Sequence, residues 1–318
     1  MRQALRDLRS RLQAFERPRA PERMPVRIGR RRIYVLPTAF GLFYGVLVLA
    51  MVLGALNYNN NPALLLALLL GAAGLASLIT AHLQLSGLQV DALSAEPVPA
   101  GAALGLRVAL SALDGRQRRG LRGELGAASG WAGIGADGHG ELALSLPTHR
   151  RGWLEPGRLR LSTTQPLGLA RAWSLAWPQQ PLLVYPRAEA HPPPLPDRGD
   201  DARLTRVHPQ GEDPHQLRAY RAGDAPRTIA WKHSARRDSL VVREYERAQQ
   251  QDVLLDWREL HGLAHEARIS RLAGWVELAE REGRRYRLRL ARQADFGPGR
   301  GPEHRHACLR ALALLPQA

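Results

Sequence analysis

The side chains best suited to chemistry lie between Leu217 and Glu246, where charged, aromatic and turn-forming residues are packed together. Lys232 is the only lysine among the 45 basic residues of the chain. Its compact ammonium group carries three donors and suits a tight polar site in a way that a planar guanidinium does not. Asp224 and Arg227 lie on either side of a proline turn. The candidate site residues are Arg218, Tyr220, Gly223, Asp224, Arg227, Trp231, Lys232, Ser234 and Arg236.

Two roles fit these residues, and the sequence alone leaves both open. In the first, the arginine and lysine side chains bind an anion or phosphate group, helped by backbone donors at the Gly223 turn. In the second, a structural or docking role, Asp224 pairs with Arg227 or Arg236 and locks the linker against the α/β unit that follows. Trp231 then packs beneath the charged side chains. We favour the second role because no general base or nucleophile accompanies the charges.

The segment resembles the signature of the bacterial domain-of-unknown-function family 58. That signature runs approximately L-R-x-Y-x-x-G-D-x-x-R-x-I-D-W-K-x-S-A-R and continues into a strand of basic and acidic residues. The matching positions are Leu217, Arg218, Tyr220, Gly223, Asp224, Arg227, Ile229, Trp231, Lys232, Ser234, Ala235, Arg236, Val242, Arg243 and Glu244. Ala230 departs from the pattern, because the family usually has an aspartate there. In weaker form the resemblance extends over nearly the whole chain.

The resemblance implies a membrane-anchored protein whose frequent partner is a cytosolic AAA+ ATPase of the MoxR type, together with other envelope-associated proteins. It also implies a C-terminal region similar to a von Willebrand factor A domain, often with a D-x-S-x-S metal loop. The corresponding residues here are Asp256-Trp257-Arg258-Glu259-Leu260. Because an arginine in this loop would repel Mg²⁺, we expect no metal site and a short, degenerate version of the domain.

The basic character of the chain does not by itself indicate nucleic-acid binding. The net charge is +16, but residues 1–37 hold eleven arginines against three acidic residues, which gives 11 − 3 = +8. The remaining excess is spread thinly, and four Phe and seven Tyr form no clustered stacking platform for single strands. The single cysteine, Cys308, excludes an internal disulfide and fits a reducing compartment.

Two charge-free segments predict a transmembrane helical hairpin at residues 38–83. Thr38–Leu56 and Ala63–Ala81 each contain 19 residues, and as helices they span roughly 28 Å, close to the ~30 Å of a bilayer core. Asn57–Pro62 forms a polar turn between them. The alternative, a pair of buried core helices, is disfavoured because both segments are apolar on every face. The arginine-rich N-terminus abuts the first span, so we expect both termini in the cytoplasm and the hairpin in a bacterial inner membrane.

The rest of the chain divides into a sandwich and a linker. Residues 84–187 contain short alternating runs punctuated by Gly and Pro, which predicts an antiparallel β-sandwich. These runs are Leu104–Leu113, Glu141–Leu146, Arg158–Ser162 and Leu182–Tyr185. Residues 188–211 read as a Pro-rich and polar linker, in which His191–Pro196 is a stiff polyproline spacer.

Residues 212–318 carry the signature and then a strand–helix–strand–helix pattern. The strands are expected at Asp252–Trp257 and Arg285–Leu290, and the helices at His265–Glu282 and His306–Leu315. This order predicts a parallel βαβ unit. The predicted fold class is therefore a multidomain membrane protein with a two-helix hairpin, an antiparallel β-sandwich and a small α/β unit.

Several enzyme classes are excluded by the sequence. A P-loop needs a lysine after glycine, whereas Lys232 follows Trp231, and neither H-E-x-x-H nor G-x-S-x-G occurs. His261 and His265 lie four residues apart without a third ligand, so we expect them to face solvent. Cys308 lies on an apolar helix face and is expected to be a small core residue. We therefore assign no catalytic, metal or cofactor residues.

These observations favour a non-catalytic adaptor or scaffold, anchored in the membrane with its bulk in the cytoplasm. Its expected partner is a MoxR-type ATPase in an envelope- or assembly-related process. The alternative is an enzyme or sensor that binds an anionic, phosphate-bearing envelope precursor through the signature. A third hypothesis, charge-driven nucleic-acid binding, predicts an affinity that falls steeply with salt and depends on residues 1–37.

Overall fold

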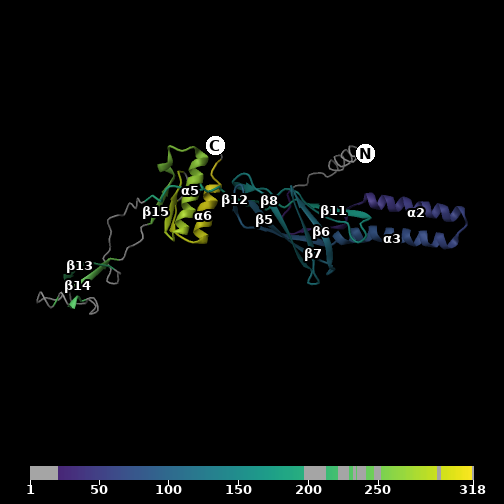
Figure 1. Cartoon of the computed structure of the whole chain (residues 1–318), viewed down its shortest axis with the longest axis horizontal. Coiled ribbons are helices and arrows are strands. Elements are labelled where there is room, and N and C mark those ends of the chain that lie inside the picture. Colours follow the sequence, from purple (N-terminus) through teal and green to yellow (C-terminus); the bar gives the residue numbers. More distant parts are fainter. Residues whose placement is uncertain are drawn as a thin grey trace. The chain divides into compact units, whose positions relative to one another are not determined.

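A computed structural model of the chain describes residues 21–196, 213–220, 229–231, 234, 241–246, 252–291 and 295–316 (Figure 1). Of these, residues 213–218 and 241–246 are described by their backbone alone. The chain divides into two units, Met1–Tyr185 and Pro186–Ala318. Each unit is described by itself.

The two long helices form an antiparallel pair. Helices α2 (Ala39–Asn57) and α3 (Asn61–Leu85) lie side by side (Figure 1). The side chains of Thr38 and Asn60 each accept a hydrogen bond from a backbone amide in the first turn, which fixes where the helices begin. Both predicted helices are confirmed, and the connection between them is only residues 58–60, shorter than expected.

Both helices are apolar and largely exposed. In the most apolar 18-residue window of each helix, only 6% of the residues are buried in α2 and 17% in α3. A pair of core helices in a soluble domain would be mostly buried, so that alternative is wrong. Both helices are long and apolar enough to cross a membrane.

The first unit also contains the predicted β-sandwich. Its strands are β1 (Val26–Arg27), β2 (Tyr34–Pro37), β3 (Leu88–Ala95), β4 (Val98–Pro99), β5 (Ala103–Ala112), β6 (Arg118–Leu125), β7 (Ala128–Ile134), β8 (His139–Pro147), β9 (Gly152–Leu154), β10 (Leu159–Thr163), β11 (Ala170–Ala176) and β12 (Leu182–Tyr185). Two antiparallel sheets have the orders β1-β3-β5-β8 and β2-β11-β10-β6-β7. A third, smaller sheet has the order β4-β12-β9, in which β12 is parallel to β4 and antiparallel to β9. Alternate side chains such as Leu106 and Val108 of β5 and Leu159 and Leu161 of β10 form one buried core.

The hairpin is inserted between two strands of this sandwich. A single residue, Thr38, separates strand β2 from α2, and β2 pairs with β11, with Leu36 opposite Arg171. Two residues, Ser86 and Gly87, separate α3 from strand β3, which pairs with β1 and β5. The segment 1–37, expected to be only a basic cytoplasmic region, therefore contributes β1 and β2 to the sandwich.

The end of α3 is built into the sandwich core. Leu85, in the last turn, is buried in the same cluster as the strand residues. Arg118 of β6 is only 2% exposed and donates hydrogen bonds to the carbonyl oxygens of Gln84 (2.8 Å) and Ser86 (3.2 Å). Its guanidinium also donates to both carboxylate oxygens of Asp114, at 2.7 and 2.9 Å. A cation from the sheet thus caps the carbonyls at the end of the helix.

The start of α2 is fixed to the loop before β11. Thr38 Oγ1 donates a hydrogen bond to the carbonyl oxygen of Gly168 (2.7 Å), and the Thr38 amide donates to that of Leu169 (2.9 Å). Gly41 approaches this loop so closely that a methyl group on it would overlap the Leu169 carbonyl oxygen. The hairpin and the sandwich therefore form one body with contacts at both helix ends.

The second unit contains the predicted βαβ arrangement. Strands β15 (Val253–Asp256) and β16 (Tyr286–Arg289) are parallel and are joined through helix α5 (His265–Arg281). Strand β17 (Phe296–Gly299), which the sequence did not predict, pairs antiparallel with β16. Helix α6 (Pro302–Ala313) packs against α5 (Figure 1). The small α/β unit is confirmed, whereas its likeness to a von Willebrand factor A domain stays a prediction.

The proline-rich segment at the start of this unit packs against α5 and is not a free spacer. The Glu189 amide donates to the Ser270 carbonyl oxygen (2.9 Å), and the Glu189 carboxylate pairs with Arg271 of α5. The indole of Trp275 donates to the carbonyl oxygen of Pro193 at 2.9 Å. Residues 189–193 therefore lie along α5 and belong to the second unit.

Candidate functional site

The signature begins and ends in a two-stranded ribbon. Strand β13 (Asp213–Ala219) pairs antiparallel with β14 (Val241–Glu246). In this register Arg218 lies opposite Val242 and Leu217 opposite Arg243, with an irregularity between Pro214 and Gln216. The two ends of the signature, more than twenty residues apart in sequence, are thus paired, which the sequence reading did not predict.

Three of the predicted site residues have described side chains. Tyr220 is 37% exposed and Trp231 is 64% exposed, so the tryptophan lies at the surface and not beneath other side chains. Ser234 is buried and its hydroxyl donates to the carbonyl oxygen of Ala230 at 3.1 Å. Ala230, the position where the family pattern has an aspartate, is 1% exposed.

The side chains of the remaining predicted site residues are not described. Arg218 is placed by its backbone only, in β13. Gly223, Asp224, Arg227, Lys232 and Arg236 lie outside the described residues. The choice between an anion pocket and a structural or docking role for the signature therefore stays a prediction.

A family model described as Protein of unknown function DUF58 matches residues 216–261. The predicted family is confirmed for this segment. The match covers the DUF58 signature, the ribbon strand β14 and the start of the α/β unit, and ends just after Leu260. No curated protein and no solved structure matches the chain.

In the loop that follows β15, the carboxylate of Asp256 is bound by other groups of the protein. Asp256 accepts a hydrogen bond from the Arg258 amide (2.8 Å), which caps a short 3₁₀ helix at Trp257–Leu260, and its other oxygen lies 3.5 Å from Arg289 Nη1. The carboxylate where the metal loop would begin is thus bound by the protein itself. Within the described parts of the chain, no three His, Cys, Asp or Glu residues are grouped as metal ligands.

A buried polar cluster in the second unit resembles a catalytic set, but its surroundings keep the cysteine thiol protonated. Cys308 Sγ lies 3.7 Å from His304 Nε2, and the hydroxyl of Tyr286 donates to Glu280 Oε1 at 2.8 Å. Burial, together with the charge of Glu280, raises the pKa of the Cys308 thiol to about 12. Burial and the bond to Glu280 also raise the pKa of Tyr286. A thiol held protonated is a poor nucleophile, so Cys308 is a core residue as predicted.

The two histidines near α5 also have structural partners. His261 Nδ1 lies 3.2 Å from the carbonyl oxygen of Arg258, and His265 Nε2 lies 2.9 Å from that of Pro316. The His265 ring meets Trp257 edge to face, with centroids 5.2 Å apart. Both imidazole rings are therefore held by contacts within the second unit.

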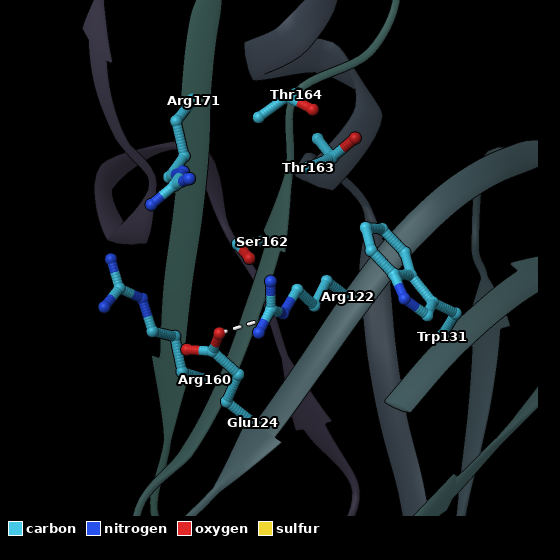
Figure 2. A pocket seen from close by; sticks show the side chains of 8 residues that line it. All are labelled: Arg122, Glu124, Trp131, Arg160, Ser162, Thr163, Thr164 and Arg171. Atoms are coloured by element: carbon cyan, nitrogen blue, oxygen red, sulfur yellow. Dashed lines mark ion pairs between the residues drawn. The ribbon is translucent and has the colours of Figure 1, made fainter. Parts of the chain in front are cut away.

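A basic pocket on the sandwich was missed from the sequence. It encloses about 180 Å³ on the outer face of the sheet β2-β11-β10-β6-β7 (Figure 2). The lining residues are Arg122, Glu124, Trp131, Arg160, Ser162, Thr163, Thr164 and Arg171. Most come from alternate positions whose neighbours face the core, so they share one side of the sheet. The sequence signal for this pocket is an arginine at one of the alternate positions of each of β6, β10 and β11, and it can be recognised only when the register of the strands is known.

Two arginines of this basic pocket are supported by tryptophans. The guanidinium of Arg122 lies over the Trp131 ring at 5.8 Å from its centroid, and that of Arg160 lies over Trp173 at 5.2 Å. Arg122 Nε also pairs with Glu124 at 3.0 Å. With three arginines and one glutamate, the lining carries 3 − 1 = +2 charges. The pocket is suited to bind an anion, and its chemistry offers no nucleophile other than hydroxyls.

Proposed function

We propose that the protein is a membrane-anchored, non-catalytic adaptor, with both units on the same side of the bilayer. The observation that carries this proposal is the exposed hairpin. An exposed pair of helices that carry no charged side chains and are predominantly apolar is unfavourable in water, and burial in lipid removes that surface from solvent. The hydrogen bonds at Thr38 and Arg118 would hold the sandwich directly at the membrane surface.

The orientation follows from the arginines near α2. Arg23, Arg27 and Arg30–Arg32 precede the helix within the described residues, and basic residues flanking a span favour the cytoplasmic side. Two crossings return the chain to the side on which it entered. We therefore place both termini and both units in the cytoplasm, at a bacterial inner membrane.

The docking role is assigned to the signature segment. Exposed Trp231 and Tyr220 support this assignment, because tryptophan and tyrosine are the residues most enriched at energetically important positions of interfaces. The partner implied by the family resemblance is a MoxR-type AAA+ ATPase, within an envelope- or assembly-related process. The second candidate role, binding of a phosphate-bearing envelope precursor by the signature, predicts that phosphorylated sugars or nucleotides raise the melting temperature of the full chain.

Membrane anchoring is tested by fractionation and by a reporter. The full chain should stay in membranes washed with alkaline carbonate, and a reporter fused after Ala318 should be active only in the cytoplasm. Release into the soluble fraction would contradict the anchoring. Activity of a reporter that works only in the periplasm would contradict the orientation.

Docking is tested by recovery of partners from solubilised membranes. We expect an ATPase to co-purify with the wild-type chain and to be reduced by Arg227→Ala and by Lys232→Ala. Arg281→Ala is the matched control, since Arg281 lies at the exposed end of α5, outside the signature. Equal recovery with all three variants would show that the signature is not the docking face.

A further inference from the structure

The basic pocket lies close to the point where the hairpin leaves the sandwich. Arg171 is opposite Leu36 in the register of β11 and β2, and Leu36 is three residues before the first residue of α2. The carbonyl oxygen of Thr164 accepts a hydrogen bond from the Gly168 amide (2.8 Å), and Gly168 in turn accepts one from Thr38 at the helix cap. The side of the pocket formed by Thr164 is therefore one hydrogen-bonded turn away from the start of the hairpin.

With the hairpin in a bilayer as proposed above, this position would fall at the headgroup layer. Three extended residues span at most about 10 Å, and the headgroup region adds roughly 5–8 Å on each side of the hydrocarbon core. An arginine side chain reaches several ångströms further and places its charge toward the interface. The 19 residues of α2 are enough to fill the hydrocarbon core, and with α2 inserted in this way Arg171 would lie within reach of lipid phosphates.

The lining offers a phosphate group more donors than an isolated surface charge would. Arg122, Arg160 and Arg171 supply guanidinium forks from three different strands, and Ser162 and Thr164 supply hydroxyl donors beside them (Figure 2). A phosphate has several acceptor oxygens in a tetrahedral arrangement, so it can accept from more than one strand at once. Glu124 opposes an anion, but its pairing with Arg122 also holds that guanidinium in place.

Aromatic side chains on the same face favour an interfacial position. Trp131 is 66% exposed although it is large and apolar. Tyr34 stacks on Trp173 with centroids 5.6 Å apart, and Trp173 supports Arg160. Tryptophan and tyrosine are enriched where a protein meets the membrane–water interface, because their rings are apolar and their N–H or O–H groups are polar.

We infer that the basic pocket binds the phosphate group of an anionic membrane lipid, such as phosphatidylglycerol, from the leaflet next to the sandwich. This inference rests on the proposed membrane anchoring and adds a specific lipid site to it. The sandwich would then bind lipid headgroups directly.

The test uses the full chain in nanodiscs of phosphatidylcholine, titrated with short-chain phosphatidylglycerol, with binding counted by native mass spectrometry. We expect Arg171→Gln to weaken binding about fivefold and Arg160→Gln with Arg171→Gln about 25-fold, from the usual contribution of one arginine near an anionic surface. Arg107→Gln is the matched control, because Arg107 is exposed on the outer face of the other sheet. Arg171 is exposed, so the single variant is expected to fold and is checked by its melting curve.

The outcomes separate the inference from the anchoring it rests on. Loss of binding in the pocket variants with Arg107→Gln unchanged supports the lipid site. Equal losses in all variants would overturn it in favour of general surface charge, and no loss in any variant would show that these arginines do not bind the lipid; carbonate-resistant anchoring would still hold in both cases. Binding of inorganic phosphate that depends on Arg171, without any preference among lipids, would overturn the lipid source and leave a soluble phosphate ligand. A chain that does not enter nanodiscs at all would refute the anchoring instead.

Discussion

Removal of the Arg118 guanidinium should loosen the junction between the hairpin and the sandwich. Arg118→Met keeps most of the apolar stem but leaves the carbonyl oxygens of Gln84 and Ser86 without their charged donor, in a place where the arginine is 2% exposed. Hydrogen bonds from a charged group contribute about 1.5–3 kcal/mol each when removed. The ion pair with Asp114 adds less, because that carboxylate is 35% exposed. We therefore expect a loss of about 3 kcal/mol.

The measurement is thermal unfolding of the full chain in detergent, followed by tryptophan fluorescence. For a domain of this size, a loss of 3 kcal/mol lowers the midpoint by roughly 6–12 °C. Arg119→Met is the control, since Arg119 is exposed on the same strand. Asp114→Asn should cost much less than Arg118→Met, because the bonds to the helix carbonyls remain. A shift of equal size in Asp114→Asn would refute the capping argument and assign the effect to the ion pair.

Three further predictions concern close packing and protonation. Gly41→Ala should lower the melting temperature by several degrees, since the methyl group overlaps the Leu169 carbonyl, whereas Gly45→Ala, with open space around it, should not. Iodoacetamide at pH 8 should leave Cys308 unmodified until the chain is denatured, because burial raises its pKa to about 12. Burial opposes ionisation of Asp114, but hydrogen bonds and nearby arginine charges hold the pKa of its carboxyl group below the usual value. The melting temperature should therefore fall as the pH drops below about 4, where this carboxylate becomes protonated. The fall should be less steep in Asp114→Asn.

Long, uniform patterns were predictable from the sequence because one kind of interaction dominates them. The hairpin helices are apolar over nineteen or more residues, and polar residues cap both. Strands such as β5 and β8 alternate strictly because one face is buried. The parallel pair β15 and β16 followed from the order strand, helix, strand. In each case the local pattern and the tertiary environment favour the same structure.

Strands β6 and β7 were missed because their glycines argue against strands. A methyl group on Gly123 would overlap the side chain of Leu142, and one on Gly130 would overlap the carbonyl oxygen of Ala143. Both neighbours belong to β8, so the two sheets approach each other closely at this point. Glycine is unfavourable in the interior of a strand, so these segments do not look like strands in the sequence. The close approach of β8 is what requires glycine at both positions.

The basic pocket was missed for a related reason. Its arginines are separated by up to about fifty residues, and each one reads locally as an ordinary solvent-facing position of a strand. They share a pocket because β10 lies between β6 and β11 in the sheet, an order that follows from tertiary pairing. The signature was found for the opposite reason, since its residues are contiguous and matched as a pattern.

The insertion of the hairpin into the sandwich constrains its topology without reference to charge. Strand β2, directly before α2, and strand β3, directly after α3, belong to the two sheets that enclose one core. A single membrane crossing would put these strands on opposite sides of the bilayer, and that core could not form. If the helices enter a membrane, both must therefore cross it, or neither does. The arginines before α2 then select only the side on which the sandwich forms.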